Sequence, residues 1–199
     1  MITLAMDSAY KMLTVGLYQD GVLLAGFCEP EFKKQSEMIF PVIEDLLKKT
    51  GLDYQDLDEV LITRGPGSYT GIRIAMTIAK VLCTSLHLPL YTLSTMELYA
   101  GMEPSANVIL DARGKRAYTA HVENGKTDWM GIVEVENLPA WLNEHPGTLI
   151  GDNYLLQREE VPVDFLANFA ALRPQAQNVE NIHALVPDYL KESDAYRVG

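Results

Sequence analysis

The sequence is poor in cysteine, in positive charge and in long apolar runs, and each shortage excludes a class of protein. Its two cysteines, Cys28 and Cys83, lie far apart in apolar surroundings, so we expect reduced core thiols rather than a disulfide. No apolar stretch approaches the roughly 20 residues that span a bilayer, and residues 1–4 lack the positive start of a signal peptide. We therefore expect a cytoplasmic protein without a membrane partner.

Basic residues are also scarce relative to acidic ones. The 199 residues include 27 acidic and 16 basic side chains, which gives a formal net charge of −11. Such a charge repels nucleic-acid phosphates, so we expect no tight binding of RNA or DNA by the isolated chain. A nucleic-acid pathway in which a basic partner binds the phosphates stays possible.

What the sequence does contain is an internal repeat. Each copy consists of an apolar strand that ends in aspartate, a turn, a second strand and a hairpin turn of the Asp-Gly or Asn-Gly type. The first copy covers residues 2–21 with Asp7 at the strand end, and the second covers residues 107–125 with Asp111 in that position. The spacing from the aspartate to the hairpin glycine is the same in both, which predicts a duplicated lobe.

Helices and strands alternate around the repeat, as in a mixed α/β fold. Apolar residues at i, i+3 and i+4 spacing predict helices over residues 36–49 and 70–86. Turn-forming residues 101–105 divide the chain into an expected N-terminal lobe, 1–101, and a short C-terminal lobe, 102–199. The other predicted elements are strands at 60–63, 90–93 and 148–150, and helices near 138–144 and 176–185.

A glycine-rich loop from Arg64 to Arg73 follows the strand at 60–63 and opens a helix. Its glycines, including Gly65 and Gly67, would let backbone N–H groups approach an anion at the positive end of that helix. The loop is neither a P-loop nor a dinucleotide fingerprint. A helix N-cap formed by Ser68 or Thr70 on a tight turn explains the same residues, and physical chemistry leaves both interpretations open.

The repeat aspartates Asp7 and Asp111 could hold a magnesium–phosphate pair across a cleft between the lobes, with the Ser8 hydroxyl on the same phosphate. An Asx-turn in each hairpin is the structural alternative, and we favour it for each aspartate taken alone. The four histidines have no metal-ligand spacing, and no Gly-x-Ser-x-Gly elbow is present. We expect neither a metal nor a nucleophile.

Four segments spread over the chain resemble the TsaB (YeaZ) family: Asp7-Ser8, the loop from Arg64 to Arg73, Asp111-Ala112-Arg113 with Tyr118, and Pro187-Asp188-Tyr189-Leu190-Lys191. The resemblance implies a two-lobed actin-like α/β fold of the sugar kinase, Hsp70 and actin (ASKHA) class. It also implies a role in making threonylcarbamoyladenosine next to the anticodon of tRNAs that read codons starting with A. Family members are non-catalytic scaffold partners of the catalytic paralogue TsaD and act with the ATPase TsaE, so we expect those partners, and a homodimer is possible for the isolated chain.

Departures from the family pattern weaken a catalytic role. The catalytic paralogue binds metal through a His-x-x-x-His pair, and the corresponding residues 33–39 contain no histidine. Arg116 stands where the family usually has glutamate, and Gly151-Asp152-Asn153 has few glycines for a nucleotide pocket. We expect no catalytic residue, metal or cofactor, and we interpret seven residues as a vestigial nucleotide site: Asp7, Ser8, Gly65, Gly67, Ser68, Thr70 and Asp111.

Two alternatives to the scaffold interpretation follow from the same residues. A small actin-like phosphotransferase would use Asp7, residues 65–71 and Asp111 around magnesium-ATP. A peptidase, an old label for the wider family, is disfavoured by the missing histidine pair.

The helix at 70–86 is apolar over a wider arc than a helix needs for its own core. Either this helix is wholly internal or a second protein covers the excess. The resemblance favours a second protein, because related chains use the two first-lobe helices to meet the paralogue or another copy of themselves. Small residues Ala75 and Ala79 would allow close helix approach. The predicted interface consists of Met38, Phe40, Ile72, Ala75, Met76, Ala79 and Cys83.

Overall fold

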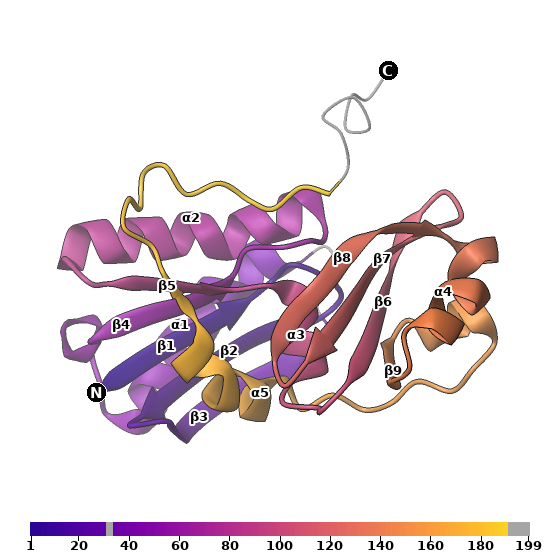
Figure 1. Cartoon of the computed structure of the whole chain (residues 1–199). Coiled ribbons are helices and arrows are strands. Elements are labelled where there is room, and N and C mark those ends of the chain that lie inside the picture. Colours follow the sequence, from indigo (N-terminus) through magenta and orange to yellow (C-terminus); the bar gives the residue numbers. More distant parts are fainter. Residues whose placement is uncertain (31–33, 191–199) are drawn as a thin grey trace.

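Each copy of the sequence repeat forms an antiparallel meander, and each meander begins one of two β-sheets (Figure 1). The computed structural model describes residues 1–30 and 34–190. The first meander comprises β1 (Ile2–Asp7), β2 (Leu13–Gln19) and β3 (Val22–Glu29), and the second comprises β6 (Ala106–Arg113), β7 (Arg116–Glu123) and β8 (Lys126–Glu134). The predicted duplication is therefore confirmed.

Parallel strands extend both meanders beyond their first strand. In the first sheet β4 (Glu59–Thr63) pairs with β1, and β5 (Leu90–Leu93) pairs with β4; in the second, β9 (Thr148–Gly151) pairs with β6. The two hairpin turns adopt the left-handed conformation at both central residues, with φ of 51° and 79° at Asp20-Gly21 and 49° and 78° at Asn124-Gly125. This is the geometry for which Asp-Gly and Asn-Gly are preferred.

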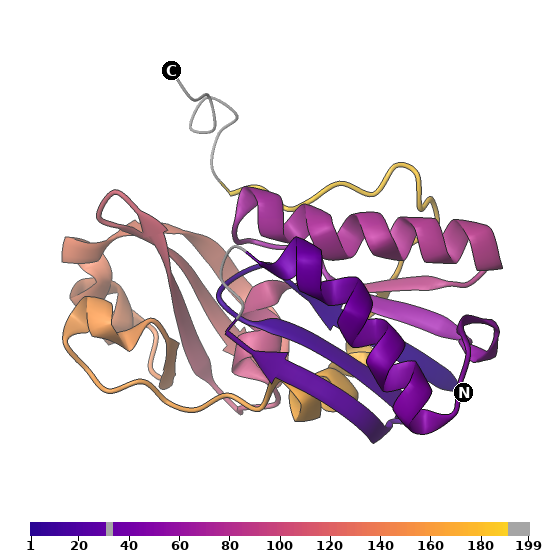
Figure 2. The ribbon, with the colours of Figure 1, turned by 180° about the vertical axis from the view of Figure 1, so that it is seen from behind.

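Helices cover both faces of the first sheet. On the face seen in Figure 2, α1 (Gln35–Thr50) packs on β2 and β3, and α2 (Tyr69–Leu86) packs on β4. These helices confirm the two predicted at 36–49 and 70–86. On the opposite face α5 (Phe165–Leu172) contacts β2 and β3, and it also contacts α3 (Thr95–Ala100), which lies against the second sheet. In the part of the chain that the structure describes, no helix combines the length and apolarity needed to span a membrane.

The remaining elements are short. The predicted helix near 138–144 and the predicted strand at 148–150 are confirmed as α4 (Leu138–Glu144) and β9. Single 3₁₀ turns are η1 (Tyr54–Asp56), η2 (Val135–Asn137), η3 (Asn153–Leu156) and η4 (Arg173–Gln175). The sequence interpretation missed α3 and α5, which are only six and eight residues long.

The predicted helix near 176–185 is wrong. Residues 177–178 form β10 (Gln177–Asn178), which pairs antiparallel with β5, and the chain continues without a helix along α2 (Figure 1). From this segment, three residues pack against the core of the first lobe: Val179, Ile182 and Leu185. Their spacing of three, which predicted a helix, therefore occurs in a segment without a helix. We call residues 176–190 the C-terminal strap.

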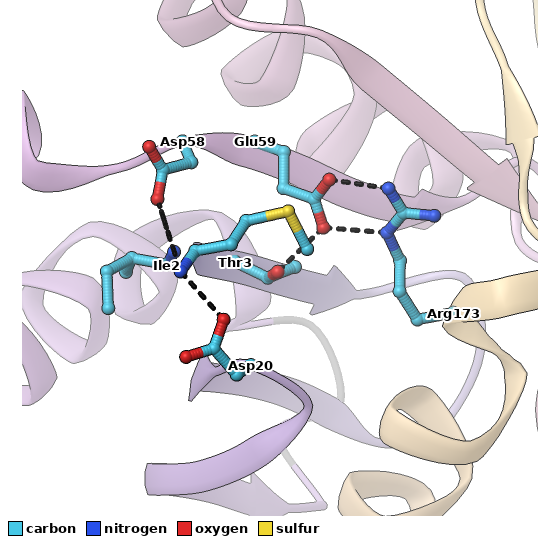
Figure 3. A network of polar contacts seen from close by, with 7 residues as sticks. Ile2, Thr3, Asp20, Asp58, Glu59 and Arg173 are labelled. Carbon is cyan, nitrogen blue, oxygen red and sulfur yellow. Dashed lines mark hydrogen bonds and ion pairs between the residues drawn. The ribbon is translucent and has the colours of Figure 1, made fainter.

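The C-terminal segment therefore returns to the first lobe. Residues 165–190, which the expected division assigns to 102–199, pack on the first sheet through α5, β10 and the strap. An ion pair fixes this return: Arg173 donates to both carboxylate oxygens of Glu59 at 2.6 and 2.5 Å (Figure 3). Its guanidinium also lies 3.6 Å from the ring centre of Tyr91.

Both cysteines are free thiols, as expected, and no disulfide joins them. Cys83 is a residue of α2 and is buried in the core, whereas Cys28 is half-buried beside Thr14. One apolar cluster lies between the first sheet and α1 and α2, and a second is shared by both lobes, with Leu93, Phe169 and Val108 among its members. The shared cluster means that the two lobes pack together through apolar side chains.

Candidate functional site

The glycine-rich loop lies between β4 and the first turn of α2. Ser68 caps α2, because its hydroxyl accepts a hydrogen bond from the backbone N–H of Gly71 at 3.3 Å. Thr70 is exposed on the first turn of the helix. The structural alternative, a helix N-cap by Ser68, therefore describes this part of the loop.

The turn after β1 occupies the space against the glycines. A Cβ atom on Gly67 would lie 2.3 Å from the carbonyl oxygen of Ala9, and one on Gly71 would lie 2.2 Å from that of Ser8. The backbone N–H of Ser68 donates to the Ala9 carbonyl at 2.7 Å. The glycines thus allow close approach of two backbone segments, and the Ser68 amide of the loop already has a carbonyl partner.

Ser8 and Asp7 are also engaged within the chain. The fully buried Ser8 hydroxyl donates to the Gly71 carbonyl at 2.7 Å and accepts from the Ala75 N–H at 3.1 Å. Asp7 is 1% exposed and accepts hydrogen bonds from the Thr63 hydroxyl and, at 3.0 Å, from the Ala9 N–H. Burial raises the pKa of Asp7 to about 6, although both hydrogen bonds favour the ionised form.

Asp111 has the same local role in the second lobe. Its carboxylate accepts from the Arg113 N–H at 2.7 Å and from the Tyr154 hydroxyl at 3.1 Å. Asp7 and Asp111 each accept the N–H two residues ahead, which is the Asx-turn alternative. Within residues 1–30 and 34–190, no three histidine, cysteine or acidic side chains gather so that they could hold a metal ion.

The C-terminal strap covers the other side of the glycine loop. The Asp188 N–H donates to the Arg64 carbonyl at 2.8 Å, and the two side chains form an ion pair at 2.8 Å. Gly65, at φ 113°, leaves room for this contact, because a Cβ there would lie 2.8 Å from the Asp188 carbonyl oxygen.

The next strap residue contacts the start of α2. The Tyr189 ring stacks on Tyr69 at 5.4 Å between ring centres, and its hydroxyl accepts from Arg73 at 2.8 Å. Two of the motifs that resemble the TsaB family, far apart in sequence, therefore bind each other. Lys191, the last residue of the C-terminal motif, lies outside the described residues, as does Lys33.

Sequence reasoning missed a buried polar side chain that contacts both lobes, Asp152. It follows β9 and is 3% exposed, and it accepts hydrogen bonds from the Tyr10 hydroxyl, the Lys11 ammonium and the Asp111 N–H. The sequence offered only the shortage of glycine at residues 151–153 as a signal. The carboxylate between the lobes thus has protein donors.

The predicted partner interface lies mostly inside the chain. Five of its residues on α2 are buried, with 0 to 4% exposure: Ile72, Ala75, Met76, Ala79 and Cys83. The chain's own strap packs against the core cluster that contains the buried residues of α2. The sequence pattern predicts a helix at 176–185 and does not predict this contact. On the two helices, Phe40 is 47% exposed, Val81 is 57% exposed, and Met38 and Ile74 are half-buried.

Comparison with known proteins gives concordant sequence matches. A family model described as TsaD: tRNA N6-adenosine threonylcarbamoyltransferase matches residues 29–144. The tRNA threonylcarbamoyladenosine biosynthesis protein TsaB of Bacillus subtilis (strain 168) is 27% identical over 220 residues, which cover 98% of this chain and 96% of that protein. The protein of the same name from Escherichia coli (strain K12) is 33% identical over 135 residues, 64% of this chain and 58% of that protein.

Two solved structures share the fold. A Pseudomonas aeruginosa protein described as similar to peptidase YeaZ superposes with a TM-score of 0.75 at 19% identity, covering 96% of this chain and 99% of that one. YeaZ from Pseudomonas aeruginosa gives 0.67 at 20% identity, covering 95% and 99%. The expected two-lobed, actin-like α/β fold is confirmed.

Proposed function

This chain belongs to the TsaD family, and within it to the TsaB/YeaZ group. We propose that it serves tRNA threonylcarbamoyladenosine biosynthesis as a non-catalytic scaffold subunit. Its partners would be a TsaD-like catalytic paralogue and a TsaE-like ATPase. The modified nucleoside would be the adenosine next to the anticodon of tRNAs that read codons starting with A.

One observation carries the non-catalytic part of this proposal. The loop, hydroxyl and carboxylates that a nucleotide would need are engaged by the chain itself: Gly67 and Gly71 face backbone carbonyls, and the Ser8 hydroxyl has two backbone partners. A phosphate would have to displace these buried hydrogen bonds, and each displaced partner left unpaired would cost about 1–3 kcal/mol. The same contacts argue against the phosphotransferase alternative.

The surface proposed for the paralogue is the solvent-exposed side of α1 and α2, the two helices on the face of the first sheet that Figure 2 shows; we call it the exposed strip. It contains the exposed apolar side chains Phe40 and Val81. Large apolar side chains at a helix surface are typical anchors of a protein interface when a partner buries them. Ala75 and Ala79 do not belong to this strip, so a charge placed there would test folding rather than association.

Reconstitution with the paralogue and the ATPase tests the proposal. We expect Val81→Glu to abolish co-purification with the TsaD-like protein and the formation of threonylcarbamoyladenosine, with circular dichroism unchanged. Val22→Glu is the matched control, because Val22 is 67% exposed but lies on β3 rather than on either helix. Equal loss in both variants, or none in either, would contradict the proposed surface.

Calorimetric titration of the isolated chain with magnesium-ATP tests the non-catalytic role separately. We expect no binding at micromolar nucleotide, and we expect tRNA to bind weakly because the net charge is −11. Micromolar ATP affinity with slow hydrolysis in the absence of partners would favour the phosphotransferase instead.

A further inference from the structure

A buried carboxylate lies where the two lobes meet, and its donors come from both lobes. Asp152 follows β9 of the second lobe, and its side chain is 5% exposed. Its Oδ1 forms an ion pair with the Lys11 ammonium at 2.5 Å, and its Oδ2 accepts from the Tyr10 hydroxyl. Tyr10 and Lys11 lie in the turn between β1 and β2 of the first lobe. One carboxylate therefore joins the two lobes.

The surrounding contacts hold this carboxylate in position. The Asp111 N–H donates to Asp152 Oδ2 at 2.7 Å, and the Tyr10 hydroxyl also lies 3.2 Å from the Asp111 carbonyl. Lys11 lies 4.9 Å from the ring centre of Tyr154, whose hydroxyl donates to Asp111. The Lys11–Asp152 ion pair joins the turn after β1 to the residue after β9. The ion pairs Arg173–Glu59 and Arg64–Asp188 instead fix the returning C-terminal segment to the first lobe.

The bonds from Lys11 and Tyr10 to Asp152 can form only while the two lobes are packed together. A carboxylate this buried needs a cation and hydrogen-bond donors, and separation of the lobes would remove Lys11 and Tyr10 together. Burial, reinforced by the hydrogen bond to Asp152, raises the pKa of Tyr10 above its ordinary value, so the phenol is a hydrogen-bond donor at neutral pH.

We propose that Tyr10, Lys11 and Asp152 form an interlobe latch, which holds the two lobes closed without any ligand. In this arrangement an ammonium and a phenol of the first lobe, rather than a bound nucleotide, bridge the two lobes. The relative orientation of the two lobes is then fixed before any partner binds. The inference rests on side-chain geometry and does not depend on the proposed function.

Hydrogen exchange and small-angle scattering of the full chain test the latch. The Asp111 N–H donates to Asp152, so Lys11→Met affects exchange at that amide through Asp152, or through Tyr154, which Lys11 also contacts. We expect the Asp111 amide to exchange roughly tenfold faster or more, because a buried carboxylate without its cation favours opening. We also expect an increased radius of gyration.

Lys49→Met is the matched control, because it breaks an exposed ion pair with Asp45 on α1 and leaves the interlobe contacts unchanged. The double variant Lys11→Met/Asp152→Asn should be no more open than Lys11→Met alone, since both changes remove the same interaction. An Asp111 amide as protected in Lys11→Met as in the parent, an unchanged radius of gyration, or strictly additive effects would overturn the latch.

Discussion

Replacement of Arg173 by methionine is the sharpest test of how the C-terminal segment is held. Glu59, at the start of β4, faces Arg173 (Figure 3). The Glu59 side chain is 3% exposed and that of Arg173 is 21% exposed. Besides its two bonds from Arg173, the carboxylate accepts from the Thr3 hydroxyl at 2.6 Å. Arg173→Met leaves this buried carboxylate without a cation. Removal of one partner from a buried ion pair costs about 3–5 kcal/mol, and we expect a loss of that size.

Urea unfolding gives the free energy of unfolding of each variant, as the product of the transition midpoint and the slope of free energy against urea concentration. Lys49→Met is the control, because Lys49 and Asp45 form an exposed pair with 63% and 56% side-chain exposure, for which the expected cost is below about 0.5 kcal/mol. The double variant Arg173→Met/Glu59→Gln should recover much of the loss, because it removes the uncompensated charge. A single-variant cost near that of the control would refute the reasoning.

The pH dependence of this cost has a defined sign. Burial opposes ionisation of Glu59, but the hydrogen bonds from Arg173 and Thr3 prevail and lower the pKa of Glu59. A lowered pKa contributes stability above the ordinary glutamate range, and that contribution disappears as the pH falls through the lowered value. In Arg173→Met burial dominates and raises the pKa, so the gap between parent and variant should narrow from neutral pH toward about pH 4. A gap that widens on acidification would contradict the assignment.

Three further predictions concern the candidate site. Because burial raises the pKa of Asp7 to about 6, ionised Asp7 costs stability above that pH, and Asp7→Asn should stabilise the protein at pH 7 by on the order of 1–3 kcal/mol, an advantage lost near pH 4 in urea unfolding. Gly71→Ala should destabilise by about 1–3 kcal/mol in thermal unfolding, since the Cβ meets the Ser8 carbonyl at 2.2 Å and this clash exceeds the gain of about 1 kcal/mol in helix propensity. Tyr189→Ala should speed proteolysis within the strap while the unfolding midpoint changes little, because Tyr189 contacts an exposed part of α2.

Local signals predicted the meanders and the long helices. The Asp-Gly and Asn-Gly dipeptides specify left-handed turns by themselves, and a helix such as α1 has a complete apolar face and a glycine cap at Gly51. In contrast, α3 and α5 are only six and eight residues long, which is too short for a helical period to stand out. Such elements are stabilised by what they pack against.

The strap shows how a local period can mislead. Val179, Ile182 and Leu185 are spaced by three, as on a helix face, yet they pack onto the first lobe from an irregular segment with a turn at residues 182–184. For the apolar arc of α2, the family resemblance favours a second protein, and burial within the chain is the alternative. Ala75 and Ala79 lie in the chain's own core, so the alternative describes these two residues. The strap is one of the segments that pack on this core.

The glycine loop illustrates why a motif alone does not determine its ligand. Its backbone N–H groups can bind a phosphate or a peptide carbonyl, because both present an oxygen acceptor to the same donors. Here the acceptor is the Ala9 carbonyl from the β1 turn, and Asp188 of the strap binds the opposite side of the loop. Both partners are distant in sequence, so only the fold decides between them. If this argument is correct, Gly67→Ala should perturb the folded chain on its own, before any nucleotide or partner protein is added, because its Cβ would lie 2.3 Å from the Ala9 carbonyl. An unfolding midpoint unchanged by that substitution would show that the loop is free to bind something else.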